Sequence, residues 1–218
     1  MDDDPLPEDG KLTRSKRRWA GEGRFLSGRP SDPATDRLPP GQHLVRDWPV
    51  LDLGRRPDIS QTRWRLTIGG MVARPIRLDW PAFTALPQAT SRSDIHCVTS
   101  WSRYDNNWKG VAARHLLDLV QPRDEARFVM LHGADGYTTA VPLADFAAPE
   151  ALLVHHWEGR ALTRDHGGPV RAVIPHLYFW KSAKWITRID LLGADKPGFW
   201  EENGYHRRGD PWAEERYG

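Results

Sequence analysis

Apolar and polar residues alternate with the two-residue period of a β-strand along several short stretches of the chain. The stretch TRWRLTIGGMV places Trp64, Leu66 and Ile68 on one face, which predicts a half-buried strand. The following RPIRLDWPAFTAL predicts a strand and then a short helix with Asp79 as its N-cap. The periodic part of the chain therefore begins with β-structure interrupted by a short helix.

Similar patterns continue toward the C-terminus. SRSDIHCV predicts a strand that ends at Cys97, and the polar stretch after it, which contains Trp101 and Trp108, predicts a loop. GVAARHLLDLV has the spacing of a helix and stops at Pro122. Further strands, one of them in a hairpin, are predicted in ARFVMLHG, YTTAVPLADF, ALLVHHWEGRAL, GGPVRAVIP and LYFWKSAKWITRIDLL. Many short strands with a few short helices predict one α+β domain of mixed β-sheets.

Both ends of the chain lack a clear period. Residues 1–37 combine an acidic start, a basic patch and a Gly/Pro/Ser-rich stretch, and we expect a disordered or loosely docked arm. Residues 38–218 are expected to form the domain. Its last part, GFWEENGYHRRGDPWAEERYG, interleaves aromatic and charged residues, which indicates a docking strap or a cap over a ligand site.

Composition is typical of a soluble globular protein. Of 218 residues, 39% are hydrophobic and 28% charged, and no apolar run is long enough to span a membrane. The net charge of +2 gives no general reason to expect nucleic-acid binding. Arg17 and Arg18 look like the start of a twin-arginine export signal, but polar residues follow them. We therefore expect no export signal and a cytoplasmic location.

Cys97 is the only cysteine of the chain. A single cysteine excludes an intramolecular disulfide and a cysteine-ligated iron–sulfur cluster. A redox function would therefore need a bound cofactor and a separate electron-transfer partner. A cysteine at the end of a strand and followed by polar residues is suited to be a metal ligand or a nucleophile. The alternative is that Cys97 is a structural thiol of the core. Close-spaced further ligands for zinc or copper are missing, and His155 and His156 are expected on opposite faces of a strand. As a nucleophile, Cys97 would make the chain a cysteine hydrolase with His176 or His156 as the base.

A second candidate site is the basic segment RDHGGPVRAVIPHLYFWKSAKW, residues 164–185. Arginine forks, lysine charges and backbone N–H groups suit an anion, most naturally a phosphate. No Walker loop and no dinucleotide fingerprint occurs. The alternatives are a basic surface or a non-catalytic module that binds a phosphorylated ligand. The polar residues of the segment are Arg164, Asp165, His166, Arg171, His176, Lys181, Ser182 and Lys184.

Three motifs together give a resemblance to a known family. They are C-V-x-x-W at Cys97, G-G-P-V-R-x-V-x-P at Gly167 and Y-x-x-K-x-x-K-W-I at Tyr178. In this order they resemble the molybdopterin-binding domain of the sulfite oxidase family. The match is best with its bacterial branch, which is related to the catalytic subunit of the periplasmic methionine-sulfoxide reductase. The resemblance runs from Leu38 to the C-terminal segment and implies a sulfite oxidase-type fold.

The resemblance also implies roles for residues of this chain. Cys97 is implied to be the thiolate ligand of molybdenum, in a molybdopterin without an attached nucleotide. Arg171 is implied to contact the cofactor, and His166 stands where relatives often have asparagine. The K-x-x-K turn is implied to wrap the cofactor phosphate. The complete set predicted to bind the cofactor is Asp52, His96, Cys97, His132, His166, Arg171, His176, Lys181, Ser182, Ala183 and Lys184.

The activity implied by the resemblance is the transfer of an oxygen atom to or from a small oxo-anion, a sulfoxide or a related substrate. Arg103 and Asp105 follow Cys97 and are predicted to select the substrate together with His96. Electrons would be exchanged with a separate haem or flavin protein, because the chain has no haem or iron–sulfur motif of its own. The residues do not determine whether the substrate is oxidised or reduced.

Overall fold

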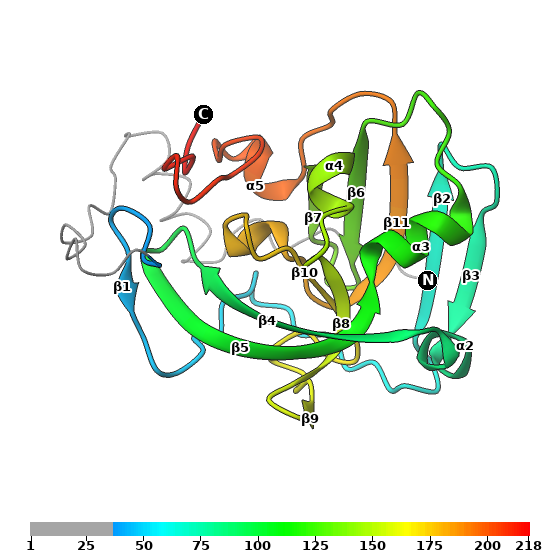
Figure 1. The fold of residues 1–218 in the computed structure, drawn as a ribbon, viewed down its shortest axis with the longest axis horizontal. Helices are drawn as coiled ribbons and strands as arrows, with labels where there is room; N and C mark the ends of the chain where they lie inside the picture. The colour runs from blue at the N-terminus through cyan, green and yellow to red at the C-terminus, as the bar shows by residue number, and fades with distance from the viewer. Residues whose placement is uncertain (1–36) are drawn as a thin grey trace.

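The structure is a computed structural model that describes residues 37–218. The predicted N-terminal arm, residues 1–37, lies outside the described residues except for Arg37. The described part forms two mixed β-sheets with short helices around them (Figure 1), which confirms the predicted fold class. None of its helices is long and apolar enough to cross a bilayer.

The first sheet has five strands, in the spatial order β3 (Ile76–Asp79), β2 (Arg65–Gly70), β11 (Ile186–Leu192), β6 (Phe128–Gly133) and β7 (Thr138–Pro142). In β2 the side chains of Leu66 and Ile68 are buried on one face, as the alternation predicts. Strand β11 pairs with β2 in parallel and with β6 antiparallel. The sheet therefore joins the predicted N-terminal strands to the segment after the K-x-x-K motif.

The second sheet follows the order β1 (His43–Leu44), β5 (Trp101–Ala112), β8 (Leu152–Trp157) and β10 (Arg171–Val173), with β4 (Gln88–His96) paired to β5 and β9 (Arg160–Ala161) paired to β8. Strands β4 and β5 run side by side as a long curved pair (Figure 1). Strand β10 pairs with β8 antiparallel, which carries the G-G-P-V-R segment into this sheet.

The prediction of a loop after Cys97 is wrong, because most of that stretch forms strand β5. Only Val98 to Ser100 form a turn, and from Trp101 the chain pairs with β4 on one side and with β1 and β8 on the other. These backbone hydrogen bonds override the polar composition, since a strand with an exposed face accepts polar side chains there. Trp108 is buried in this strand, whereas its neighbour Asn107 is exposed.

The expectation that His155 and His156 point to opposite faces is also wrong. Their Nδ1 atoms lie 2.5 Å apart, and their rings meet edge to face. The pairing of β8 with β5 shifts register here, because Lys109 faces His156 but Gly110 faces Val154. Such a bulge leaves His155 without a cross-strand partner and breaks the strict alternation of side chains.

The helices are short. Asp79 accepts a hydrogen bond from the N–H of Ala82 at 3.0 Å and caps α2, as predicted. Helix α3 ends before Pro122, also as predicted, with Gln121 in the left-handed conformation. The helical elements are α2 (Trp80–Ala85), α3 (Ala113–Val120), α4 (Leu143–Phe146), α5 (Phe199–Glu202) and the 3₁₀ helix η1 (Phe179–Lys181).

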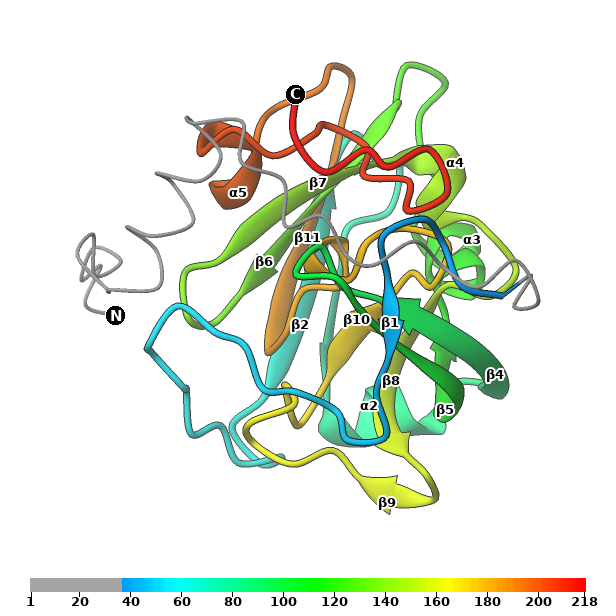
Figure 2. The same ribbon diagram turned by 90° about the vertical axis from the view of Figure 1, so that its left-hand side faces the viewer.

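The C-terminal segment after α5 runs across one end of the molecule, past α4 and the loop before β1 (Figure 2). Arg208 donates two hydrogen bonds to Asp145 of α4. Arg216 is buried and donates to the carbonyl oxygens of Val98 at 2.8 Å and Pro40 at 3.1 Å. These contacts dock the segment firmly, as a strap would.

Candidate cofactor pocket

A pocket lies where both sheets and the C-terminal segment meet. The sheet with β4 and β10 contributes the turn after Cys97 and the side chain of Arg171, and the other sheet contributes the β6–β7 turn. The remaining lining comes from the segment 48–53, the loop before β10, the residues from η1 to Lys184, and Trp200 and Tyr205. Segments distant in sequence therefore converge on the predicted thiol.

Cys97 sits in a hydrogen-bonded turn at the end of β4. Its N–H donates to the carbonyl of Trp101 at 2.8 Å, and its carbonyl accepts from the N–H of Ser100 at 3.0 Å. The Sγ atom lies 3.1 Å from Oγ1 of Thr99. Cys97 is 6% exposed and faces the pocket, so the turn presents one sulfur to whatever the pocket holds.

Arg171 is a buried cation in the pocket wall. Its guanidinium donates to the carbonyl oxygens of His166, Ala172 and Ser182 and lies over the ring of Phe179 at 4.3 Å. Burial lowers the pKa of Arg171 to about 9. Within residues 37–218 no carboxylate lies within ion-pair distance of it. A buried charge without a counter-ion is costly, so this position favours an anionic ligand.

Lys184 is a second cation of the same wall. Its Nζ donates to the carbonyl of Asp165 at 2.9 Å and lies 4.2 Å from the centre of the Trp185 ring. Burial, and next the charge of Arg171, lower its pKa to about 8. Gly167, with φ of +98°, makes room for it, because a Cβ there would lie 2.9 Å from the Lys184 Cβ. This glycine therefore serves the packing of Lys184.

Two carboxylates also line the pocket. Burial raises the pKa of Asp135 to about 6, although its Oδ1 accepts the N–H of Tyr137 at 3.1 Å. Burial opposes ionisation of Asp52 as well, but hydrogen bonds from the Gly54 N–H and Arg56 bring its pKa below the usual value. The pocket therefore has an ionised acid at its rim and a more easily protonated acid inside.

Several aromatic side chains belong to the remaining wall. Trp48 packs edge to face on Trp108 and lies 4.0 Å from the ring of His166, centre to centre. Trp101 is buried, and its indole N–H has no hydrogen-bond partner among the described residues. Burial, then Tyr217 and then Cys97, raise the pKa of Tyr205. Its hydroxyl therefore keeps its proton.

A family model described as the oxidoreductase molybdopterin-binding domain matches residues 53–200, which is more than half of the chain. The chain belongs to this family. The family member "uncharacterized oxidoreductase YuiH" of Bacillus subtilis is 46% identical over 194 residues, a match that covers 88% of this chain and 98% of the relative. This molybdopterin-binding oxidoreductase is therefore similar to YuiH over almost the whole length of both proteins.

More distant relatives are longer than this chain. The protein-methionine-sulfoxide reductase catalytic subunit MsrP of Campylobacter jejuni is 25% identical over 182 residues, which covers 71% of this chain and 59% of the relative. The sulfane dehydrogenase SoxCD from Paracoccus pantotrophus has a similar solved structure, with a TM-score of 0.61 and 18% identity over 72% of this chain and 46% of that chain. This likeness confirms the sulfite oxidase-type fold of the molybdopterin-binding oxidoreductase.

The residues of the pocket fit the family's cofactor. A thiolate such as that of Cys97 is a suitable ligand for a soft metal centre. Arg171 and Lys184 provide positive charge for a phosphate, and the buried N–H of Trp101 lacks an acceptor in the described structure. Residues 37–218 contain no cluster of three or more His, Cys, Asp or Glu side chains placed for a metal ion. A metal at Cys97 would therefore take its other ligands from outside this part of the chain.

The structure brings part of the predicted site together. The predicted residues that line the pocket are Asp52, Cys97, His166, Arg171, Ser182, Ala183 and Lys184. Ser182 accepts the N–H of Ile174 with its hydroxyl at 2.9 Å, so its side chain supports the backbone. His166 is held between Thr163 and the carbonyl of Trp48, and burial lowers its pKa.

Four other residues predicted to bind the cofactor lie outside the pocket lining. His96 contacts the hydroxyl of Ser102 and, because of burial, has a pKa of about 4. His132 lies in β6 beside Asp190 at 3.0 Å. The other two are His176, which contacts Asp145 and Glu150, and Lys181, which contacts Glu201. Each of these side chains therefore has a partner within the fold.

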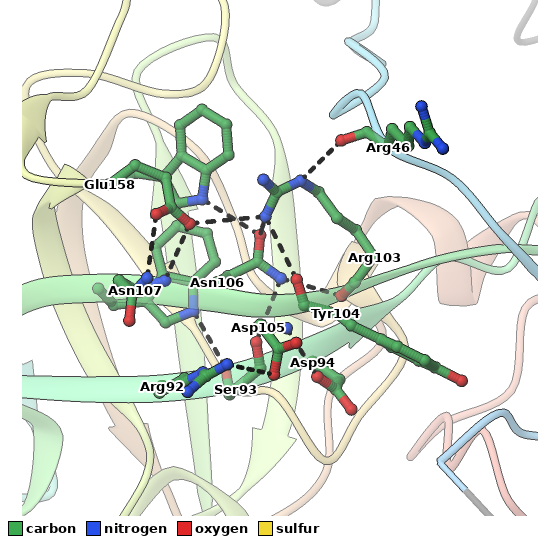
Figure 3. Close-up of polar contacts among 12 residues, drawn as sticks. Arg46, Arg92, Ser93, Asp94, Arg103, Tyr104, Asp105, Asn106, Asn107 and Glu158 are labelled. Atoms are coloured by element: carbon green, nitrogen blue, oxygen red, sulfur yellow. Dashed lines mark hydrogen bonds and ion pairs between the residues drawn. The ribbon is translucent and has the colours of Figure 1, made fainter. Parts of the chain in front are cut away.

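Arg103 and Asp105, predicted at the substrate mouth, lie in the β4–β5 pair outside the pocket lining (Figure 3). Arg103 donates to the carbonyl of Arg46 and to the side chain of Asn106. Asp105, with φ of 58°, forms ion pairs with Arg37 and Arg92. Sequence proximity to Cys97 does not bring them to the pocket, because β5 carries the chain away from the turn.

Several lining residues were not predicted from the sequence. Asp135 and Tyr137 come from the β6–β7 turn, and Trp180 and Tyr205 come from η1 and the C-terminal segment. No sequence pattern indicated Asp135; its closeness to Gly133, where a Cβ would lie 2.4 Å from the Asp135 carboxylate, is visible only in the structure. For Tyr205 the interleaved aromatic tail was noted, but its docking partner could not be identified from sequence.

Proposed function

We propose that the pocket binds a molybdenum–pterin cofactor, with the Cys97 thiolate as the protein ligand of the metal and Arg171 and Lys184 at the phosphate. The observation that carries the proposal is that the single cysteine lines the same pocket as two cations, the buried Arg171 and the half-buried Lys184, and neither has a carboxylate within ion-pair distance among the described residues. The form without an attached nucleotide is proposed from the resemblance to sulfite oxidase-type domains. Family membership supports the cofactor class.

The proposed activity is oxygen-atom transfer on a sulfoxide or a small oxo-anion. When bound, the molybdenum supplies a two-electron exchange in which an oxygen atom passes between substrate and metal. The turn fixes the backbone at Cys97, and tryptophan side chains line the pocket beside it. Tyr205 lines the same pocket and retains its proton, so its hydroxyl can donate a hydrogen bond there. The methionine-sulfoxide reductase relative supports this substrate class.

We further propose that electrons are exchanged with a separate haem or flavin protein. One cysteine cannot hold an iron–sulfur cluster, and the sequence has no C-x-x-C-H motif for covalently attached haem. A relative is named as a catalytic subunit, which supports a division of labour between chains. The alternative function of a cysteine hydrolase gains no support. Its two candidate bases, His156 and His176, do not line the pocket that contains Cys97.

Elemental analysis tests the cofactor proposal. Protein from a host that synthesises molybdopterin should contain nearly stoichiometric molybdenum, and Cys97→Ala should lose it or lose all turnover. Thr90→Val, an exposed change on β4, is the matched control and should retain both. Metal-free wild-type protein from such a host would overturn the proposal. Molybdenum retention with unchanged turnover in Cys97→Ala would exclude Cys97 as the ligand.

A panel of assays tests the substrate class. Reduced dyes should be oxidised in the presence of sulfoxides, N-oxides or chlorate, and sulfite oxidation with an artificial electron acceptor should be measured alongside. We expect the highest turnover with a sulfoxide, because the pocket wall includes aromatic and aliphatic side chains that can accept an apolar substituent. Turnover with sulfite alone would contradict the assignment of a sulfoxide substrate.

A further inference from the structure

Three carbonyl groups of the turn at Cys97, those of Cys97, Val98 and Ser100, accept hydrogen bonds from neighbouring segments. Gln42 donates its Nε2 to the carbonyl of Cys97 at 3.1 Å, and Arg216 donates to that of Val98 at 2.8 Å. The carbonyl of Ser100 accepts from the backbone of β1 at 2.9 Å. The β1 strand, the C-terminal segment and the loop before β1 therefore fix this turn from outside, and side chains on it have little freedom to shift.

Thr99 occupies the third position of this rigid turn. Its hydroxyl oxygen lies 3.1 Å from the sulfur of Cys97, well within the range of a hydrogen bond to sulfur. With a neutral thiol either atom can donate the proton. A thiolate has no proton to give, so in that state the threonine hydroxyl must be the donor.

We propose that Thr99 is a positioning residue that donates an O–H···S hydrogen bond to the Cys97 thiolate and sets the reduction potential of the metal bound there. The inference rests on the proposed function. A hydrogen bond withdraws electron density from the sulfur, so the sulfur donates less strongly to the metal. Hydrogen bonds to ligating sulfurs are an established means by which proteins tune metal potentials. Thr99 therefore favours the reduced metal.

Its place in the turn distinguishes Thr99 from an ordinary packing residue. The side chain is half-buried, and its described hydrogen bond is to the sulfur and not to a backbone group. Valine has the same shape but no hydroxyl, whereas serine keeps the hydroxyl and loses one methyl group. The two substitutions therefore separate the hydrogen bond from the packing of the side chain.

The test is a redox titration of the loaded protein, followed by EPR of the molybdenum. Thr99→Val should lower the midpoint potential, because the sulfur then donates more strongly and favours the oxidised metal. We expect about a tenfold change in the one-electron equilibrium, which corresponds to about 59 mV. Thr99→Ser and the control Thr90→Val should keep the wild-type potential. An unchanged potential in Thr99→Val, or an equal shift in Thr99→Ser, would overturn the inference.

Molybdenum content, measured first, separates this inference from the proposed function. If wild-type protein from a competent host contains no molybdenum, both are overturned. If molybdenum is present and depends on Cys97, but the potential is insensitive to the hydroxyl, only the role of Thr99 is overturned. Should Thr99→Val fail to load the metal, Thr99→Ala provides the second hydroxyl-free variant. Failure of both to load while Thr99→Ser loads normally would contradict a role confined to the potential.

Discussion

The two lysines of the K-x-x-K motif lie three residues apart and have opposite surroundings. Lys181 is fully buried, and its Nζ contacts the Glu201 carboxylate at 2.5 Å and the Ala140 carbonyl at 2.7 Å. Lys184 lines the pocket and has no carboxylate within ion-pair distance among the described residues. One sequence motif therefore supplies one cation to the fold and the other to the ligand site.

The two lysines differ in whether a counter-ion within the fold pairs with them. Glu201 also accepts from Thr139 and Trp180, so the Lys181 pair is a complete network that ties η1, β7 and α5 together. At Lys184 no carboxylate of the described residues lies within ion-pair distance. Burial and then the charge of Arg171 lower its pKa, and the charges of Asp52 and Asp135 offset this only in part. We therefore expect Lys181→Met to affect mainly the stability of the fold and Lys184→Met to affect mainly the retention of the cofactor.

The largest effect is expected from Lys181→Met on stability. Removing one partner of a buried ion pair leaves the Glu201 charge uncompensated, which typically costs about 3–5 kcal/mol. Urea unfolding of the cofactor-free protein should show this loss as a lower midpoint at an unchanged slope. Lys184→Met is the matched control and should show no loss of stability, because it removes a charge that burial disfavours. Equal losses in the two variants would remove the distinction.

Lys184→Met should instead weaken cofactor retention. Loss of one charge-assisted contact to a phosphate typically costs about 1.5–3 kcal/mol, which is about tenfold or more in affinity. The measurement is molybdenum per folded chain after extensive dilution and gel filtration. Lys184→Arg, which keeps the charge, should recover part of the retention. Full retention in Lys184→Met would exclude this lysine from the phosphate site.

The pH dependence of stability is a further test of the surroundings of Lys184. The pKa of Lys184 is lowered from 10.5 to about 8 in the folded protein, by burial and then by Arg171. Between these values the unfolded chain binds a proton that the folded chain has released, so this lysine makes the unfolding free energy rise with pH. We expect wild-type cofactor-free protein to gain stability relative to Lys184→Met from pH 8 to 9.5. A pH-independent difference would contradict the lowered pKa.

The fold was predictable wherever burial imposes a period. Leu66 and Ile68 alternate because one face of β2 is buried, and Asp79 indicates its helix because an N-cap needs a side-chain acceptor. Strand β5 was missed because much of its middle is polar, so its hydrogen-bonding partners decide its conformation. The bulge at His155 was missed for a similar reason, since it depends on the register with β5.

The site was predictable where its chemistry is concentrated in one segment. Arg171 and Lys184 belong to a visibly basic stretch, and Cys97 is unique in the sequence. Asp135 and Tyr205 reach the same pocket from other parts of the chain, through the order of the strands and the docking of the strap. Contacts of this kind depend on topology, which residue patterns do not encode locally.

The smallest effect is expected from Asp105→Asn, which tests the prediction made from proximity to Cys97. Its ion pairs with Arg37 and Arg92 are exposed, and exposed pairs contribute little to stability. Asparagine also tolerates the positive φ of this position. Molybdenum content, kcat and KM should therefore match those of wild type. A selective fall in kcat/KM with unchanged metal content would contradict this expectation and support the prediction that Asp105 helps to select the substrate. It would also show that the reacting site extends beyond the pocket to β5.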